Sequence, residues 1–360
     1  MHPKADLRAP FPFLAECVYL DTAAAGLSSP GQGMAVAEFF DHVKTRGILG
    51  RETWRKKLSD LQQRLARMFD IAVDDVLLFS NTSEGINLVA HSLDWHAGDN
   101  LLVAEDEYPT VSQAWHIAER QSAEIIRIPI SNEHNRESEL LAAMNVRTRV
   151  MALSQVHWVT GTTIDLKRVG DACRANGTLL VVDGVQAWGA VPIDLSSVDV
   201  YSAAVFKWIL SGFGLAICIV SARARAQLDS AYRGAMNLTA PHHLQYSHMN
   251  YPGIYALDAA LDFLDGCGWD RIHAQVGALS KYLYKELSDR GFVVAAPLDA
   301  LAGIISFAVP DPAALCQQLE RRGIKVTGRA GRIRASPHFY NNQHDLDRLV
   351  EAVCDLSRPA

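Results

Sequence analysis

The chain predicts an α/β fold in which helices cover both faces of a mainly parallel sheet. Seven short runs of apolar and β-branched residues lie between residues 76 and 220, mostly separated by helical segments, and all but those at 125–128 and 198–202 are free of charged residues. Strands of this kind are buried on both faces. Beyond residue 268 the order of elements changes, which predicts a smaller α+β unit. We expect a large domain over 17–268 and a small domain formed by 1–16 and 269–360.

Each element follows from a local pattern. Compact apolar runs predict strands, and apolar residues spaced three or four apart, with charges on the opposite face, predict helices. An interruption by two glycines at 266–268 predicts a break in one long helix. In the first 220 residues we expect strands at 18–21, 76–79, 101–104, 125–128, 150–153, 179–182, 198–202 and 215–220, and helices at 30–49, 54–69, 84–93, 111–120 and 166–176. Further on we expect helices at 255–264, 269–290, 312–322 and 344–356, and strands at 303–309, 324–327 and 332–336.

Composition excludes several classes of function. The 360 residues are 49% hydrophobic with a formal net charge of −6 and no basic stripe, so we expect no nucleic-acid partner. The six cysteines lie far apart without a Cys-x-x-Cys pair, which favours free thiols over a zinc site. Neither an apolar leader nor a membrane-spanning run is visible, so we expect no membrane partner and a cytoplasmic protein.

Lys207 is an unusual lysine. It lies among apolar and small residues, a few positions after the expected strand at 198–202. Burial disfavours the charged ammonium, and a neutral amine can condense with an aldehyde. Lys207 is therefore a candidate Schiff-base lysine, and a solvated lysine at a strand end is the alternative.

Asp183 ends the apolar run Leu179-Leu-Val-Val-Asp183. At the carboxyl end of a central parallel strand its carboxylate would face the ligand crevice, where it can keep the ring nitrogen of pyridoxal phosphate protonated. Gln186, three residues later, can reach the phenolic oxygen of the same cofactor. The alternatives are a turn or helix-capping aspartate and a polar surface glutamine.

A strand gives way directly to a helix at Phe79-Ser-Asn-Thr-Ser-Glu-Gly. Backbone N–H groups at this helix N-terminus, with the hydroxyls of Thr82 and Ser83, suit a phosphate monoester. An ordinary helix cap gives the same pattern. Tyr108 follows another strand, where it can stack on a planar ring or cover the core.

Arg332 and Arg334 alternate with apolar residues along an expected strand, so both point the same way. A guanidinium at this place can bind a carboxylate through two parallel hydrogen bonds. Surface arginines on an edge strand are the alternative.

In combination these motifs resemble the class V aminotransferase family of fold type I pyridoxal-phosphate enzymes, the group that contains cysteine desulfurases and isopenicillin N epimerase. The resemblance extends from Tyr19-Leu-Asp-Thr-Ala-Ala24 to Asp345-Leu-Asp-Arg-Leu-Val350. It implies a homodimer with pyridoxal 5'-phosphate at the subunit interface and an amino acid as substrate.

Carried over by position, the resemblance assigns roles to the residues above. Lys207 would bind the cofactor's aldehyde carbon, Asp183 its pyridine nitrogen, Gln186 its phenolic oxygen, and Thr82 and Ser83 its phosphate. Arg334, with Ala24 beside it, would bind the substrate α-carboxylate. Tyr108 falls where many relatives have a stacking histidine, and Trp158 falls where desulfurases have an asparagine. This aromatic pair, together with the sequence Lys207-Trp208, looks more like the isopenicillin N epimerase branch of the family.

Three departures limit the transfer of function. Relatives commonly carry Ser-Gly-His before the lysine, with two phosphate contacts, whereas this chain has Ala204-Val205-Phe206. A Gly-Thr pair that reaches the partner's phosphate is replaced by Ser247-His248, so His248 either takes that role or is an unrelated rim histidine. The segment 326–332 has no cysteine where a desulfurase carries its nucleophile, so ordinary cysteine desulfuration is not expected.

We therefore expect an enzyme that removes the Cα proton of an amino acid through Lys207, most plainly a β- or γ-elimination or replacement in a biosynthetic pathway. Transamination and epimerisation share this first step, and the visible candidates for a second acid are Tyr108, His157 and His248. A non-catalytic binding protein that retains the fold is the alternative from another class. Neither the substrate side chain nor the outcome of the reaction follows from the sequence.

Overall fold

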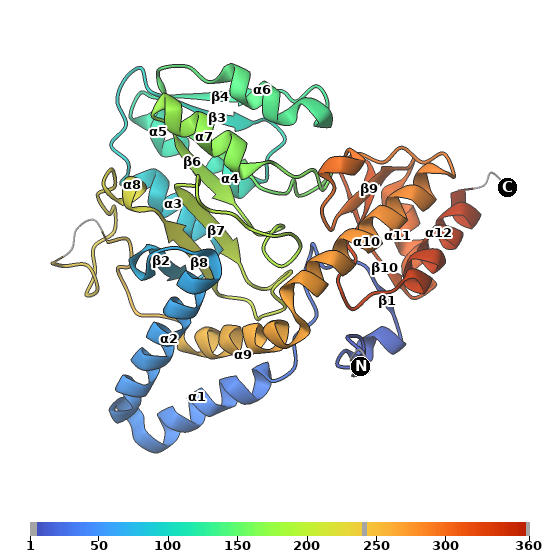
Figure 1. The fold of residues 1–360 in the computed structure, drawn as a ribbon, viewed down its shortest axis with the longest axis horizontal. Coiled ribbons are helices and arrows are strands. Elements are labelled where there is room, and N and C mark those ends of the chain that lie inside the picture. Colours follow the sequence, from blue (N-terminus) through green and yellow to red (C-terminus); the bar gives the residue numbers. More distant parts are fainter. Residues whose placement is uncertain (1–5, 240–242, 358–360) are drawn as a thin grey trace.

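The computed structural model describes residues 6–239 and 243–357. A large sheet flanked by helices forms one body, and a smaller body with the C-terminal helices packs beside it (Figure 1). The large sheet has the order β2-β8-β7-β6-β5-β3-β4, and its strands are parallel except β8, which is antiparallel to both neighbours. The prediction of a mainly parallel, seven-stranded sheet is confirmed. Its strands are β2 (Val76–Phe79), β3 (Asn100–Ala104), β4 (Glu124–Ile128), β5 (Thr148–Ser154), β6 (Leu179–Asp183), β7 (Val200–Ala204) and β8 (Ala216–Val220).

Both faces of this sheet are buried, as the continuous apolar runs require, except at the edge strand β4, where Glu124 and Arg127 are exposed. Along β6, Leu180 and Val182 pack into one hydrophobic core while Leu179 and Val181 pack into another on the opposite face. One core takes side chains from α2 (Arg51–Phe69), α6 (Arg136–Ala143), α7 (Leu166–Asn176) and α9 (Tyr251–Cys267); the other takes them from α3 (Thr82–Ser92), α4 (Pro109–Gln113), α5 (His116–Arg120) and α8 (Ala222–Arg225). Helix α1 (Gln32–Arg46) lies against α9.

The smaller body holds an antiparallel sheet of order β11-β12-β9 and a parallel pair β1-β10. Strand β1 follows residue 17 but pairs with β10, and Val18 shares a hydrophobic core with Leu349 of the last helix. The domain boundary at residue 17 stays a prediction. The elements are β1 (Val18–Tyr19), β9 (Ile305–Ala308), β10 (Ile324–Lys325), β11 (Thr327–Arg329), β12 (Arg332–Ala335), α10 (Trp269–Ser288), α11 (Pro312–Arg321) and α12 (Gln343–Ser357).

A glycine breaks the helix that joins the two bodies. Gly268 separates α9 from α10 and has φ +84°, a backbone region in which a side chain is strained. The expected interruption is confirmed. Within the described ranges, no helix is long and apolar enough to cross a membrane.

Local differences from the expected elements have tertiary causes. The helix expected at 111–120 is divided into α4 and α5 at Trp115, whose indole is fully buried. The strand expected at 324–327 is divided because β10 pairs with β1, whereas β11 pairs with β12 in another sheet. Helix α6 was not expected from the sequence.

Candidate active site

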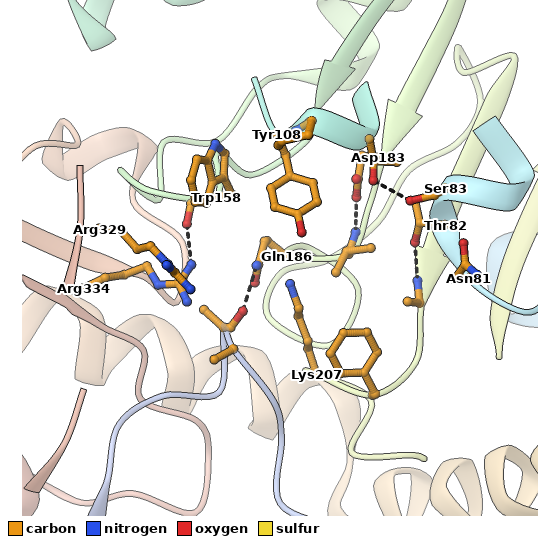
Figure 2. A pocket seen from close by; sticks show the side chains of 18 residues that line it. Asn81, Thr82, Ser83, Tyr108, Trp158, Asp183, Gln186, Lys207, Arg329 and Arg334 are labelled. Atoms are coloured by element: carbon orange, nitrogen blue, oxygen red, sulfur yellow. Dashed lines mark hydrogen bonds between the residues drawn. The ribbon is translucent and has the colours of Figure 1, made fainter. Parts of the chain in front are cut away.

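A cavity of about 510 Å³ opens where the parallel strands of the large sheet end. Its wall combines segments that follow β2, β3, β6 and β7 with residues from the loop after β1 and from the β11–β12 hairpin (Figure 2). This is the crevice in which α/β sheets bind ligands. The lining residues are Ala23, Ala24, Asn81, Thr82, Ser83, Tyr108, Pro109, Thr110, Ser154, Trp158, Asp183, Val185, Gln186, Ala204, Phe206, Lys207, Arg329 and Arg334.

Lys207 projects into this cavity with a free amine. Its Nζ lies 5.5 Å from the centroid of the Phe206 ring, and no residue in the described ranges forms a hydrogen bond or ion pair with it. Burial lowers the pKa of the ammonium to about 8, against the attraction of Asp183, which raises it. A larger share of the amine is therefore neutral near pH 7 than for a solvated lysine, as a nucleophile for an aldehyde requires.

Asp183 ends β6 and is buried at the base of the cavity. Its Oδ1 accepts a hydrogen bond of 2.9 Å from the Val185 N–H. Burial raises the pKa of this carboxyl to about 6, although the Val185 hydrogen bond and the Lys207 charge lower it. A buried carboxylate in this state is stabilised by a cationic partner, and a protonated pyridine nitrogen is such a partner.

The N-terminus of α3 lines another part of the cavity. Asn81 caps the helix by accepting a hydrogen bond of 2.9 Å from the Glu84 N–H. The N–H groups of Thr82 and Ser83, the first two residues of the helix, have no acceptor within the described residues and are left to a ligand. Thr82 Oγ1 accepts from the Ala204 N–H at 2.9 Å, and Ser83 Oγ lies 2.6 Å from Thr110 Oγ1. Hydroxyls and N–H groups at a helix N-terminus suit a phosphate.

The aromatic residues Tyr108 and Trp158 form the wall across from Lys207 (Figure 2). Their rings meet edge to face, with centroids 5.4 Å apart and planes at 70°. The Trp158 Nε1–H donates to the Asp106 carbonyl oxygen at 3.1 Å. Two loops, one after β3 and one after β5, are thereby joined at the cavity rim.

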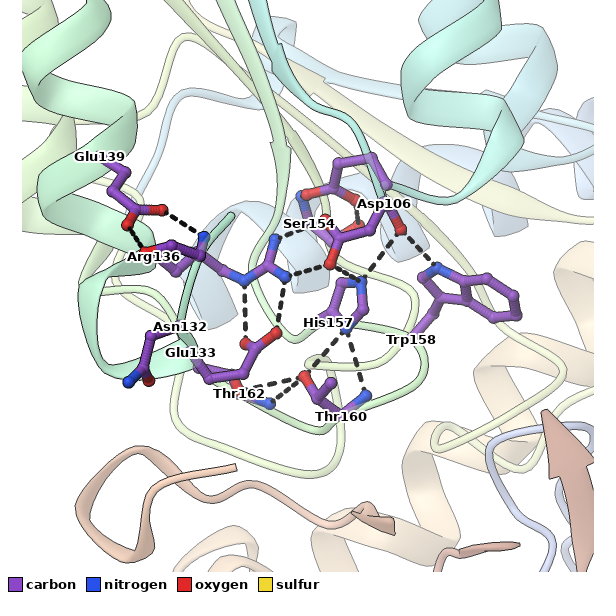
Figure 3. Close-up of polar contacts among 12 residues, drawn as sticks. Asp106, Asn132, Glu133, Arg136, Glu139, Ser154, His157, Trp158, Thr160 and Thr162 are labelled. Atoms are coloured by element: carbon purple, nitrogen blue, oxygen red, sulfur yellow. Dashed lines mark hydrogen bonds and ion pairs between the residues drawn. The ribbon is translucent and has the colours of Figure 1, made fainter. Parts of the chain in front are cut away.

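A hydrogen-bonded network behind these loops keeps them in place (Figure 3). Arg136 is 2% exposed and binds Asp106 at 3.0 Å and Glu133 at 2.8 Å. His157 Nε2 lies 3.1 Å from the Asp106 carbonyl oxygen, and its Nδ1 lies 2.9 Å from Thr160 Oγ1. Ligand atoms of Asp106, Glu133 and His157 lie within 4.8 Å of one another, but Arg136 already forms ion pairs with both carboxylates.

Arg334 forms the base of the cavity on the side of the smaller body. Its Nη1–H donates to the Trp158 carbonyl oxygen at 2.8 Å, and its Nη2 lies 3.8 Å from Asp21 Oδ1. Asp21 also accepts a hydrogen bond of 2.5 Å from Thr327 Oγ1. The Arg334 Nε and Asp21 Oδ1 are buried without a hydrogen-bond partner. Arg334 therefore has one unused hydrogen-bond donor and Asp21 one unused acceptor. Ala24 lines the same side.

Two histidines from the sequence analysis lie elsewhere. His248 lines a separate, smaller cavity together with Tyr246 and Asn250, so within one chain it does not reach Lys207. His157 is buried and both its ring nitrogens have partners in the network, so it is not available as a second acid in the cavity.

Four polar lining residues were not identified from the sequence. Asn81, Thr110 and Ser154 lie at or after the ends of strands, where their side chains resemble ordinary cap and turn residues. Arg329 was missed because it lies at the end of β11, a strand that the sequence analysis had merged with β10. The period of two from Thr327 to Arg329 would have indicated a shared face.

One cavity of this mainly parallel sheet contains the amine of Lys207, the carboxylate of Asp183 and the helix N-terminus of α3, which suits a phosphate. This combination of fold and site defines the class of fold type I pyridoxal-phosphate enzymes. The aminotransferase class-V family model matches residues 18–349. The chain belongs to this family.

Curated relatives within the family have different activities. A cysteine desulfurase of Cronobacter sakazakii is 28% identical, with 98% of each chain covered. Isopenicillin N epimerase of Amycolatopsis lactamdurans is 26% identical, with 95% of this chain and 98% of the relative covered. A solved C-DES mutant with glycine covalently linked to its pyridoxal-phosphate cofactor has a TM-score of 0.89 at 23% identity and covers 97% of this chain and 99% of its own.

The side chains of the cavity fit the family's cofactor. Lys207 would offer its unpaired amine to the aldehyde, Asp183 its carboxylate to the ring nitrogen, and α3 its first N–H groups to the phosphate. The expectation of pyridoxal 5'-phosphate is confirmed, as is the family.

Proposed function

We propose that this chain is an enzyme that removes the Cα proton of an amino acid and then eliminates or replaces a group at its β or γ carbon. One observation supports the proposal above all. The unpaired amine of Lys207 and the buried guanidinium of Arg334 line the same cavity, so a substrate held by its α-carboxylate can present its Cα to the lysine. Pyridoxal phosphate, when bound, supplies an electron sink for the negative charge that develops at Cα.

The chain's own residues have separate tasks in this proposal. Lys207 holds or releases the proton at Cα, and its lowered pKa makes both protonation states accessible near neutral pH. Asp183 stabilises positive charge at the base of the cavity. Arg334 orients the α-carboxylate, while Tyr108 and Trp158 narrow the side of the cavity across from Lys207.

Cysteine desulfuration through a protein thiol is not supported by the cavity. None of its lining residues is a cysteine. The β11–β12 turn contains only Ala330 and Gly331, so no long loop carries a thiol over Lys207. We propose instead that sulfur or another leaving group departs directly from the substrate.

Epimerisation is a second candidate, because Tyr108 lines the cavity across from Lys207 (Figure 2). A hydroxyl on that side can exchange a proton with the opposite face of Cα. We further propose a homodimer in which His248 enters the partner's site, and a reducing compartment such as the cytoplasm, in keeping with six unpaired cysteines.

A panel of L-amino acids tests these proposals. The holoenzyme is mixed with each amino acid, the cofactor's absorbance is recorded, and the products are identified by mass spectrometry and chiral chromatography. We expect spectral changes and, for one side-chain class, a keto acid with a released leaving group. A wild-type protein that binds the cofactor but shows no spectral change with any amino acid would support a non-catalytic binding protein instead.

A further inference from the structure

The cavity holds a second arginine besides Arg334. Arg329 ends β11, and Arg334 lies in the adjacent antiparallel strand β12. Thr327 pairs with Arg334 and Arg329 pairs with Arg332, so all four side chains belong to one face of the hairpin. Figure 2 shows the Arg329 and Arg334 guanidinium groups side by side, and both residues line the cavity.

The two arginines differ in their partners. Arg334 is 3% exposed and is held by the Trp158 carbonyl oxygen, with Asp21 behind it. Arg329 is exposed at the mouth of the cavity, and its guanidinium forms no hydrogen bond or ion pair within the described part of the chain. Burial lowers the pKa of Arg334, and the Arg329 charge lowers it further, so the two neighbouring cations repel each other.

Charges in the cavity are unbalanced in favour of cations. Three lining residues are cationic, Lys207, Arg329 and Arg334, while Asp183 is the one carboxylate among the lining residues. The cofactor accounts for Lys207 and Asp183, and Arg334 is assigned to the α-carboxylate. Asp21 attracts Arg329 from a distance, because the Arg329 charge lowers the pKa of that carboxyl, but Asp21 already faces Arg334. Within the described part of the protein, the Arg329 guanidinium therefore has an attractive neighbour but no ion pair or hydrogen bond, and neither the cofactor nor the α-amino-acid group is assigned to it.

We propose that Arg329 binds a second anionic group on the substrate side chain, so that the preferred substrates are amino acids with an acidic side chain. This inference rests on the proposed function of the same site. Arg334 lies deeper and is fixed by its protein contacts, which suits the α-carboxylate that all substrates share. Arg329 lies at the mouth with a free guanidinium, which suits a group that differs between substrates.

A competing arrangement has both arginines on the single α-carboxylate. The two arrangements differ in one measurable respect. If Arg329 binds the substrate side chain, its removal weakens the binding of acidic substrates and leaves the binding of their neutral amides unchanged. If Arg329 shares the α-carboxylate with Arg334, its removal weakens the binding of the acidic amino acids and of their amides equally.

The test compares isosteric pairs, L-aspartate with L-asparagine and L-glutamate with L-glutamine. Holoenzymes of the wild type, Arg329→Gln and Arg332→Gln are titrated with each amino acid, and dissociation constants are taken from the cofactor's absorbance and from calorimetry. Arg332 is the matched control, since it lies on the same hairpin face but outside the cavity lining.

We expect the wild type to bind at least one acidic member roughly tenfold more tightly than its amide, and Arg329→Gln to remove this preference while changing amide binding less than about twofold. Arg332→Gln should keep the preference. The preference should also fall with added salt, because an exposed charge pair is screened.

Three results would overturn the inference. One is a wild type without preference for either acidic member, the second is an equal loss for acids and amides in Arg329→Gln, and the third is loss of the preference in Arg332→Gln as well. Absence of any spectral change and any binding heat with all four amino acids and with the wider panel would instead refute the proposed function, and the inference with it. Binding of amides with spectral change but without acid preference refutes only the inference.

Discussion

Trp208 donates a hydrogen bond of 2.9 Å from its indole Nε1–H to Oε1 of Gln186. The Gln186 Nε2 group in turn donates to the Ala23 carbonyl oxygen at 3.0 Å. Because indole nitrogen can only donate, Trp208 fixes which end of the amide is oxygen. One of the two Nε2 hydrogens is left over, and Gln186 lines the cavity beside Lys207, so the amide is oriented as a donor toward a ligand.

Replacement of Trp208 by Phe tests this orientation. The variant leaves the buried Gln186 oxygen without its hydrogen-bond donor. We therefore expect the free energy of unfolding to fall by about 1–3 kcal/mol. We also expect the absorbance of the bound cofactor to shift. Thermal unfolding and a spectrum of the holoenzyme measure the two effects.

Trp115→Phe is the matched control, because Trp115 is equally buried and donates to the Val111 carbonyl oxygen at 2.7 Å away from the cavity lining. It should lose stability but keep the spectrum. An unchanged spectrum in Trp208→Phe would refute the positioning role of Trp208.

The lowered pKa of Lys207 predicts the pH dependence of cofactor capture. Below pH 8 the ammonium is protonated and not nucleophilic; above it the amine is neutral. The apoprotein should therefore capture pyridoxal phosphate faster as the pH rises, with a midpoint near about 8 rather than near the ordinary value of lysine. Stopped-flow absorbance measures the rate. A midpoint above pH 10 would contradict the burial argument, and Lys207→Ala should show no borohydride-reducible band.

Arg136 should stabilise the fold at neutral pH and less so in acid. Burial would raise the pKa of Glu133, but the hydrogen bonds and charge of Arg136 dominate and lower it to about 2. The stability from this pair is complete above the ordinary pKa of glutamate and is lost as the pH falls toward about 2. We expect Arg136→Gln to reduce the free energy of unfolding by roughly 2–4 kcal/mol at pH 7, because it leaves Glu133 without its cation.

Denaturant unfolding at a series of pH values measures this difference. The difference in free energy of unfolding between the wild type and Arg136→Gln should become smaller as the pH falls from 4 to 2. Arg168→Gln, which removes an exposed ion pair with Glu137, is the control and should change stability by less than about 1 kcal/mol. A gap that stays constant with pH would show that Glu133 is not the responsible partner.

Mixing of two inactive variants tests the proposed dimer. If His248 serves the partner's site, Lys207→Ala and His248→Ala subunits together form one site that has both residues. Activity should then reappear after the two proteins are mixed and refolded, and light scattering should give the mass of a dimer. Continued inactivity of a mixture that forms heterodimers would show that His248 does not act across the interface.

The sequence predicted the fold because its strands are local and strongly patterned. The run from Leu179 to Val182 is apolar throughout, and such a run can only be satisfied in a sheet covered on both faces. Polar residues directly after such runs, namely Thr82, Asp183 and Lys207, then meet at one edge because parallel strands end at the same edge. The strand order therefore brings the residues that we propose for the ring nitrogen, the phosphate and the aldehyde into one cavity.

Tertiary structure alone decided the functions of side chains with several possible partners. Local sequence could not tell whether His157 faces the cavity, and packing assigns it to the Arg136 network. It also could not show that Arg334, 313 positions from Asp21 in sequence, has that carboxylate behind it, or that Arg329 shares its cavity.

The physical reason is the range of the interactions. Hydrophobic periodicity and helix capping act over a few residues, so the sequence by itself determined most of the elements and the family, and it indicated Lys207 and Asp183 as neighbours in one site. Ion pairs and hydrogen bonds between loops depend on how two bodies pack, so only the tertiary structure decided the orientation of Gln186 by Trp208 and the pairing of Arg334 with Asp21.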